Sequence, residues 1–137
     1  MLKLKHPLVE GRGGVMEILI GLTAAYLALV IFQKLTGPKV IHVKGSQLDE
    51  MIKDKSVKRQ FVDVRNIDEY NAHKVKGFRN IPLNVLSKRL KELDPAIPVV
   101  LMCASGARSM KAAQILSKAG YKNLVNVRGG ISSYPRT

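Results

Sequence analysis

The sequence predicts an α/β fold, a small doubly wound parallel sheet flanked by helices, preceded by one transmembrane helix. Two observations carry this prediction. From residue 40 onward, short apolar runs of strand length alternate with segments of helix length. Before residue 34, the chain contains a long run without charged side chains. The 137 residues suffice for about one domain and an appendage.

The transmembrane prediction rests on residues 18–32, which contain no charged side chain. Together with the mostly uncharged residues on either side, the stretch reaches about 20 residues, which is enough to cross the hydrocarbon core of a bilayer. A buried core helix would show a polar stripe, which is missing here. A cleaved signal peptide would have small residues just after the run, where this chain has Phe-Gln-Lys-Leu at 32–35. We therefore expect a transmembrane helix at residues 15–33.

The orientation of this helix depends on where the chain starts, because lysines and arginines lie on both sides of it. Met16 opens the segment MEILIGL, and the preceding Gly-Arg-Gly-Gly can be encoded by codons that resemble a bacterial ribosome-binding site. We hypothesise that Met16 is the true start and that residues 1–14 are an extension upstream of it. All lysines would then follow the span, which predicts a single-pass protein of the cell membrane with a cytoplasmic domain.

A linker at residues 34–39 leads into a domain at residues 40–137. Its strands are expected at residues 40–43, 61–64, 98–102 and 123–127, which are apolar runs of strand length. Amphipathic or helix-start patterns lie between them at residues 47–54, 67–74, 83–93 and 107–119. Ser46 and Asp49 resemble a capping box for the first of these helices.

Cys103, the only cysteine of the chain, stands between the expected strand at 98–102 and the helix at 107–119. Ligands of open α/β sheets bind at such strand ends. The backbone N–H groups of residues 104–108 and the positive end of the helix would stabilise an anion there. The obvious anion is the Cys103 thiolate, whose pKa these surroundings lower.

The loop residues fit this interpretation individually. Gly106 permits a positive φ, and Ala104, Ser105 and Ala107 are small enough to leave the sulfur accessible. Arg108 can close the loop or hold an incoming anion. The alternative is a packed, inert thiol at the end of a core strand.

Other chemistries find less support. His6, His42 and His73 are isolated in sequence, so no metal site and no cofactor are expected. The formal net charge of +13 is spread along the chain without a nucleic-acid motif, and we expect a solvated basic face that could lie near anionic lipid, not a nucleic-acid interface.

Three motifs in order make residues 40 to about 134 resemble a single rhodanese domain. CASGARS at 103–109 is similar to the six-residue active loop of that family, with cysteine first. FVDVRNIDEYNAHKVKGFRNIP at 61–82 resembles its second signature, although Ala72 stands where the family commonly has glycine. VRGGI at 127–131 resembles its Gly-Gly turn.

The resemblance implies a membrane-anchored sulfurtransferase of the thiosulfate sulfurtransferase type. Cys103 would accept a sulfane sulfur as a persulfide from thiosulfate or a persulfide donor, including a protein persulfide. It would pass the sulfur to a thiol or to cyanide. Ala104, Ser105, Gly106, Ala107 and Arg108 would bind the substrate. Asp63 and Arg65 read as a structural polar pair at the rim of the sheet.

Two alternatives are weighed against this function. Cysteine phosphatases use a related loop but place five residues between cysteine and arginine, whereas four separate Cys103 from Arg108. The tighter loop suits a smaller sulfur centre. The second alternative is a rhodanese fold without catalysis, used for docking or redox sensing at the membrane.

Overall fold

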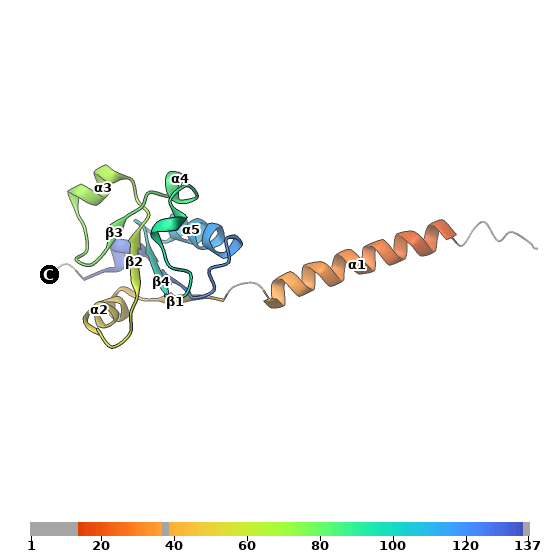
Figure 1. Ribbon diagram of the computed structural model, residues 1–137, viewed down its shortest axis with the longest axis horizontal. Helices are drawn as coiled ribbons and strands as arrows, with labels where there is room; N and C mark the ends of the chain where they lie inside the picture. Colours follow the sequence, from red (N-terminus) through yellow and green to blue (C-terminus); the bar gives the residue numbers. More distant parts are fainter. Residues whose placement is uncertain (1–13, 37–38, 136–137) are drawn as a thin grey trace, which may run out of the picture. The chain divides into compact units, whose positions relative to one another are not determined.

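The computed structural model describes residues 14–36 and 39–135, and the chain divides into two compact units. The first unit contains one long helix, α1 (Gly14–Thr36), and the second contains all the other described elements (Figure 1). Apart from Gly14, the expected N-terminal extension at residues 1–14 lies outside the described residues, as do residues 37–38 of the expected linker.

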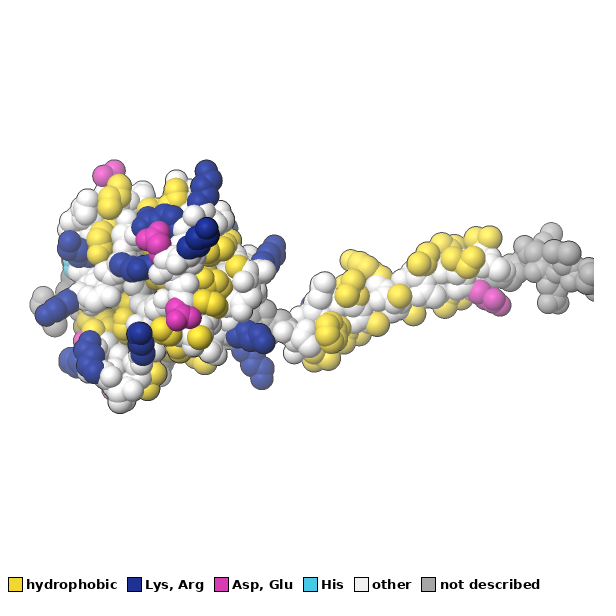
Figure 2. All heavy atoms as spheres, viewed as in Figure 1, with side chains coloured by type: hydrophobic (Ala, Val, Ile, Leu, Met, Phe, Trp, Pro, Cys, Tyr) yellow, Lys and Arg dark blue, Asp and Glu magenta, His cyan; other side chains and the backbone are white. Residues whose placement is uncertain are grey.

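Helix α1 is long and apolar enough to cross a membrane. Its 23 residues give a length of about 34 Å at 1.5 Å per residue, against about 30 Å for a hydrocarbon core. None of its residues is buried, and hydrophobic side chains lie along the whole of its visible face (Figure 2). The helix continues to Thr36, so residues 34–36, which were expected in the linker, are helical.

The second unit is built on a parallel sheet of five strands in the order β1-β5-β4-β2-β3. Every pairing is parallel, with Val62 of β2 and Asn126 of β5 both opposite Leu101 of β4. The strands are β1 (Val40–Val43), β2 (Gln60–Asp63), β3 (Arg79–Asn80), β4 (Val99–Met102) and β5 (Leu124–Val127). The four expected strands are confirmed, and β3 is an addition whose two residues are too few to leave a pattern.

Helices cover both faces of this sheet, which confirms the doubly wound prediction (Figure 1). Successive side chains of the central strand β4 point to opposite faces. Val99 and Leu101 join one apolar cluster, and Val100 and Met102 join the other. The first cluster includes residues of α4 (Leu83–Leu86) and α5 (Ala107–Lys118), and the second includes residues of α2 (Gly45–Lys53).

The amphipathic segment at residues 83–93 is not one helix. Helix α4 ends at Leu86, and a separate 3₁₀ helix, η1, covers Leu90–Glu92. The Tyr121 hydroxyl oxygen lies 2.9 Å from the carbonyl oxygens of both Leu90 and Leu93, and its one proton is donated to either of them. The backbone hydrogen bonds of this segment span three residues instead of four, which is the pattern of a 3₁₀ helix.

The start of α2 also differs from the expectation. Its cap is Lys44, whose backbone N–H donates to the Gln47 side chain at 2.8 Å, so Ser46 lies inside the helix. Asp49 instead pairs with Lys53 at 2.6 Å and accepts a hydrogen bond from the Tyr134 hydroxyl.

Candidate active site

Cys103 follows the last residue of β4, and three residues separate it from the start of α5. The thiol therefore lies at the carboxyl edge of the sheet, where the sequence predicts it. The residue is 1% exposed, which corrects the expectation that small neighbours leave the sulfur accessible. The backbone N–H of Gly106 is one of the groups packed against the sulfur, at 3.0 Å. We call residues 103–108 the Cys103 loop.

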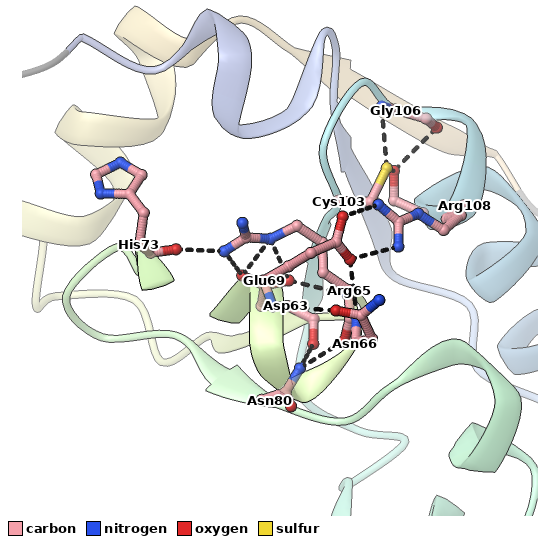
Figure 3. A network of polar contacts seen from close by, with 10 residues as sticks. Asp63, Arg65, Asn66, Glu69, His73, Asn80, Cys103, Gly106 and Arg108 are labelled. Atoms are coloured by element: carbon pink, nitrogen blue, oxygen red, sulfur yellow. Dashed lines mark hydrogen bonds and ion pairs between the residues drawn. The ribbon is translucent and has the colours of Figure 1, made fainter. Parts of the chain in front are cut away.

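Gly106 shapes this loop. Its φ of +105° is a conformation that side-chain-bearing residues rarely adopt, and it turns the Gly106 N–H toward the sulfur. That N–H donates to Cys103 Sγ at 3.0 Å (Figure 3). We expected the backbone N–H groups of the loop to point toward the sulfur, and the N–H of Gly106 does so.

The pKa of the Cys103 thiol is lowered from its ordinary value by the balance of two opposed effects. Burial alone would raise the pKa, because it disfavours the charged thiolate. Hydrogen bonds outweigh burial: the Ser109 hydroxyl, followed by the backbone N–H groups of Ser109, Gly106 and Ser105, favour the thiolate. The start of α5 adds the positive end of a helix dipole.

A polar network lies behind the sulfur, inside the domain. Ser109 Oγ lies 3.4 Å from Cys103 Sγ and 2.9 Å from the Gly106 carbonyl oxygen, and it also contacts Asn126 Oδ1. Asn126 Nδ2 in turn lies 3.4 Å from His42 Nδ1. Because a hydroxyl carries one proton, Ser109 donates to only one of its three partners at a time. Ionisation of Cys103 favours donation to the sulfur.

The Gly-Gly turn holds the other side of the Cys103 loop. Gly129 and Gly130 have φ values of +77° and +58° and lead into a 3₁₀ helix, η2 (Gly130–Ser133). The backbone N–H of Ile131 donates to the Cys103 carbonyl oxygen at 2.8 Å, and the Ser132 hydroxyl donates to the Ala104 carbonyl oxygen at the same distance. The Gly-Gly turn therefore contacts the backbone of the Cys103 loop, so these two sequence motifs lie side by side.

Arg108 is occupied by an acidic partner. Its guanidinium donates two hydrogen bonds to the Glu69 carboxylate, at 2.7 and 2.8 Å, from the start of α5 to α3 (Ile67–Ala72) (Figure 3). Asn66 caps α3, and it fixes Glu69 by accepting from its N–H and donating to its carboxylate. The sequence predicts Arg108 as a group for an incoming anion, but Glu69 neutralises much of that charge.

A hollow of about 300 Å³ opens beside the Cys103 loop. Arg108 and Asn66 supply its polar wall, together with Asn84, while Val64 and Leu83 supply apolar surface. The hollow therefore suits a small molecule with both polar and apolar parts.

Asp63 and Arg65 form the structural pair that the sequence predicts. Asp63 is fully buried and Arg65 is 4% exposed. Arg65 Nη2 lies 2.7 Å from Asp63 Oδ2 and also donates to the His73 carbonyl oxygen at 2.6 Å. Asn80 of β3 donates to the carbonyl oxygens of both Asp63 and Arg65 (Figure 3). The pair joins β2, β3 and the segment after α3.

In the part of the chain that the structure describes, no three His, Cys, Asp or Glu side chains lie close enough together to hold a metal ion. The polar groups next to Cys103 form hydrogen bonds with its sulfur.

Comparison with known proteins agrees with this geometry. The family model of the Rhodanese-like domain matches residues 28–136. The chain belongs to the rhodanese family. The sulfurtransferases among its relatives support sulfur transfer at the level of the family.

Three relatives illustrate the extent of the match. The Bacillus subtilis protein YqhL is 39% identical over 77 residues, which are 56% of this chain and 61% of that protein. The thiosulfate sulfurtransferase GlpE of Shewanella oneidensis is 31% identical over 93 residues, 68% of this chain and 90% of that protein. The solved rhodanese-like domain protein from Staphylococcus aureus superposes with a TM-score of 0.65 at 25% identity, covering 70% of this chain and 92% of that chain.

Sequence reasoning missed three polar residues of this rhodanese domain. The contact between Ser109 and Cys103 was not predicted, because Ser109 follows the predicted loop at 104–108. Its position in the first turn of the helix could have indicated the contact, because such a serine is within reach of a thiol that precedes the helix. Asn126 interrupts an apolar strand, a pattern that could have marked a buried polar contact. Glu69 carried no signal, because 39 positions separate it from Arg108.

Proposed function

We propose that this rhodanese is a membrane-anchored sulfurtransferase that carries a sulfane sulfur as a persulfide on Cys103. The observation that carries the proposal is the set of hydrogen bonds that lower the pKa of this thiol at a strand-to-helix loop. A thiolate is the nucleophilic form of cysteine. A buried cysteine that served packing alone would need none of these donors.

The proposed transfer has two displacement steps. The Cys103 thiolate attacks the outer sulfur of thiosulfate, the S–S bond of the donor breaks, and sulfite leaves with the electron pair. A thiolate or cyanide then attacks the outer sulfur of the Cys103 persulfide, and the Cys103 thiolate is released with the bonding electrons. The Gly106 N–H and the Ser109 hydroxyl are placed to stabilise negative charge on Cys103 Sγ in both steps.

Small donors and acceptors fit the site. The Shewanella relative is named a thiosulfate sulfurtransferase, which supports thiosulfate or a persulfide as the donor. We assign substrate binding to Ala104, Ser105, Gly106, Ala107 and Arg108, with the hollow beside Arg108 as the route of approach.

The proposed anchor is α1. It is long enough to cross a bilayer core and has no buried residue, as expected for a lipid-facing helix and not for a core helix. Lys34, Lys39 and Lys44 follow its apolar part closely. With Met16 as the start, the positive-inside rule places these lysines and the rhodanese domain on the cytoplasmic side.

The test of sulfur transfer is chemical. The full chain in mild detergent is incubated with thiosulfate or with glutathione persulfide, and its Cys103 peptide is weighed by mass spectrometry. We expect a gain of one sulfur atom, removed again by cyanide, and no gain in the Cys103→Ser variant. A chain that stays unmodified with both donors would exclude the sulfurtransferase.

The burial of Cys103 supports one second candidate, a docking or redox-sensing module without turnover. In that case an oxidant such as hydrogen peroxide would modify the thiol, whereas sulfur donors would leave it unchanged. The same mass measurement separates the two functions.

A further inference from the structure

A second hollow, of about 370 Å³, lies at the other end of the sheet from Cys103. Lys39, Arg59 and Lys122 line it, and each stands within two residues of the amino end of a strand: β1, β2 and β5, respectively. Because all strands are parallel, these positions share one edge of the sheet, and Cys103 lies past the opposite edge. We call this hollow the basal hollow.

The basal hollow combines positive charge with exposed apolar surface. Ile41 and Val57, which also line it, are 61% and 46% exposed. Among the described residues of the domain, the exposed large hydrophobic side chains are Ile41, Val57 and Ile67, so two of the three lie here. A ligand in the hollow would therefore find apolar side chains next to the cations.

The cations of the hollow are largely available to a ligand. Within the described residues, Lys39 and Lys122 take part in no salt bridge, and both are exposed. Arg59 is held at the rim by Asp54, 3.4 Å away, and by the Met51 carbonyl oxygen at 3.2 Å. Across the visible face of the domain, Lys and Arg side chains are widely spread, with few acidic ones among them (Figure 2). The expected ligand is therefore an anion with an apolar part.

Lys39, which lines the basal hollow, is close in sequence to the end of α1. Lys39 is the third residue after Thr36, and three residues span at most about 11 Å. If α1 crosses the bilayer, Lys39 must lie at or near the headgroup layer. Lysine and arginine next to apolar side chains are the combination that binds at this depth, with cations at the phosphates and aliphatic groups below them.

We propose that the basal hollow binds the phosphate headgroup of an anionic phospholipid, with Lys39 and Lys122 at the phosphate and Ile41 and Val57 at the boundary with the acyl chains. This inference rests on the membrane anchor proposed above and is independent of sulfur transfer.

The consequence is a fixed orientation of the rhodanese domain. A short linker alone permits many orientations, whereas a lipid bound at the basal edge selects one. The four residues of β4 separate the two edges of the sheet by about 10 Å, so the Cys103 loop would face away from the bilayer, toward donors in solution.

The test uses the full chain in lipid nanodiscs. Cys103→Ser removes the native thiol, and Val57→Cys carries a fluorophore in the basal hollow. A matched label at Asn84→Cys reports on the Cys103 side, because Asn84 lines the other hollow. The discs contain phosphatidylcholine alone or with phosphatidylglycerol, and a nitroxide on lipid headgroups quenches nearby fluorophores.

We expect quenching at Val57→Cys to rise severalfold when phosphatidylglycerol is present, with little change at Asn84→Cys. Lys39→Gln with Lys122→Gln should abolish the rise. Lys111→Gln with Arg128→Gln removes the same charge from other exposed positions and should preserve it. Equal quenching at the two labels, no dependence on phosphatidylglycerol, or equal losses in both charge variants would overturn the proposal.

Two further outcomes are separable. A chain that fails to enter the discs overturns the anchor and this inference together. A chain that enters them without lipid-dependent quenching overturns this inference and leaves the anchor in place. Tight binding of RNA that only the Lys39→Gln, Lys122→Gln variant loses, without a lipid effect, would assign the hollow to nucleic acid instead.

Discussion

Arg108 and Glu69 face each other in a two-fold hydrogen-bonded ion pair, with Nη1 to Oε2 at 2.7 Å and Nη2 to Oε1 at 2.8 Å. Hydrogen bonds from the Arg108 guanidinium, opposed by burial, lower the pKa of Glu69 to about 2. The carboxylate is thus charged throughout the physiological range. Arg108, the sixth residue of the Cys103 loop, is therefore already paired with a carboxylate. This pairing weakens its attraction for a dianion such as thiosulfate.

Glu69→Gln should shift donor preference toward the more highly charged donor. The amide leaves the Arg108 charge free to face the hollow. A partly exposed pair is worth up to about 1 kcal/mol, which corresponds to roughly fivefold in relative rate. We expect kcat/KM for thiosulfate to rise by about this factor relative to cysteine persulfide. Glu92→Gln, which breaks the exposed pair with Arg89, is the control and should leave the ratio unchanged. An unchanged ratio in Glu69→Gln would assign Arg108 to loop structure.

The same pair makes a pH-dependent contribution to stability. A carboxyl with a lowered pKa in the folded state stabilises the fold above its unfolded pKa, near 4.5, and loses this contribution as pH falls toward about 2. About a third of each side chain is exposed, so the contribution is about 1 kcal/mol or less. Denaturant unfolding should show a constant difference between the native chain and Glu69→Gln above pH 5, shrinking toward pH 2. A difference that grows on acidification would contradict this assignment.

Ser109→Ala should raise the pKa of Cys103. Hydrogen bonds from Ser109 counter the effect of burial, and a hydrogen bond to a charged group contributes about 1.5–3 kcal/mol. Losing the hydroxyl should therefore lower the thiolate fraction at any pH within the titration range of Cys103, and the rate of iodoacetamide alkylation with it. The pH profile of that rate should move to higher pH. Ser117→Ala, a serine at the far end of the same helix, should leave it in place. A profile that stays fixed in Ser109→Ala would mean that the backbone donors suffice.

The sequence predicts those parts of the structure whose signal is local. The apolar run of β4, the cysteine after it and the glycine that turns the loop are neighbours in the chain, and their arrangement follows from short-range rules. The carbonyl oxygens of Leu90 and Leu93 contact Tyr121, 31 and 28 positions further along the chain, and no pattern within residues 83–93 reports such a contact. The partner of Arg108 is hidden for the same reason. Contacts between elements depend on how the elements pack, and no local pattern reports that.

The Asp63–Arg65 pair should be essential for the fold. Both side chains are buried, so Asp63→Asn leaves an uncompensated guanidinium inside the domain. Breaking a buried pair in this way costs about 3–5 kcal/mol, a large part of the stability of a small domain. Lys53→Ala breaks the exposed pair with Asp49 and should have little effect on stability, because solvent screens exposed ion pairs. Thermal unfolding of both variants in mild detergent measures the contrast, and similar losses would show that the buried pair has no special weight.

Gly130 should tolerate no side chain, because it packs against the backbone of the Cys103 loop. A Cβ atom there would lie 2.6 Å from both the carbonyl carbon and the carbonyl oxygen of Ala104, and closer still to the Cys103 carbonyl oxygen. Backbone atoms cannot rotate away, so Gly130→Ala must deform the loop. Gly120→Ala is the control: its φ of +96° is at least as unfavourable for a side chain as that of Gly130, but no atom lies within 4 Å of the added carbon. We expect Gly120→Ala to lose about 1–2 kcal/mol of stability and to keep the alkylation profile of Cys103. Gly130→Ala should lose more stability and shift the profile to higher pH, because the donors no longer surround the sulfur. Equal behaviour of the two variants would mean that the Gly-Gly turn does not position the thiol.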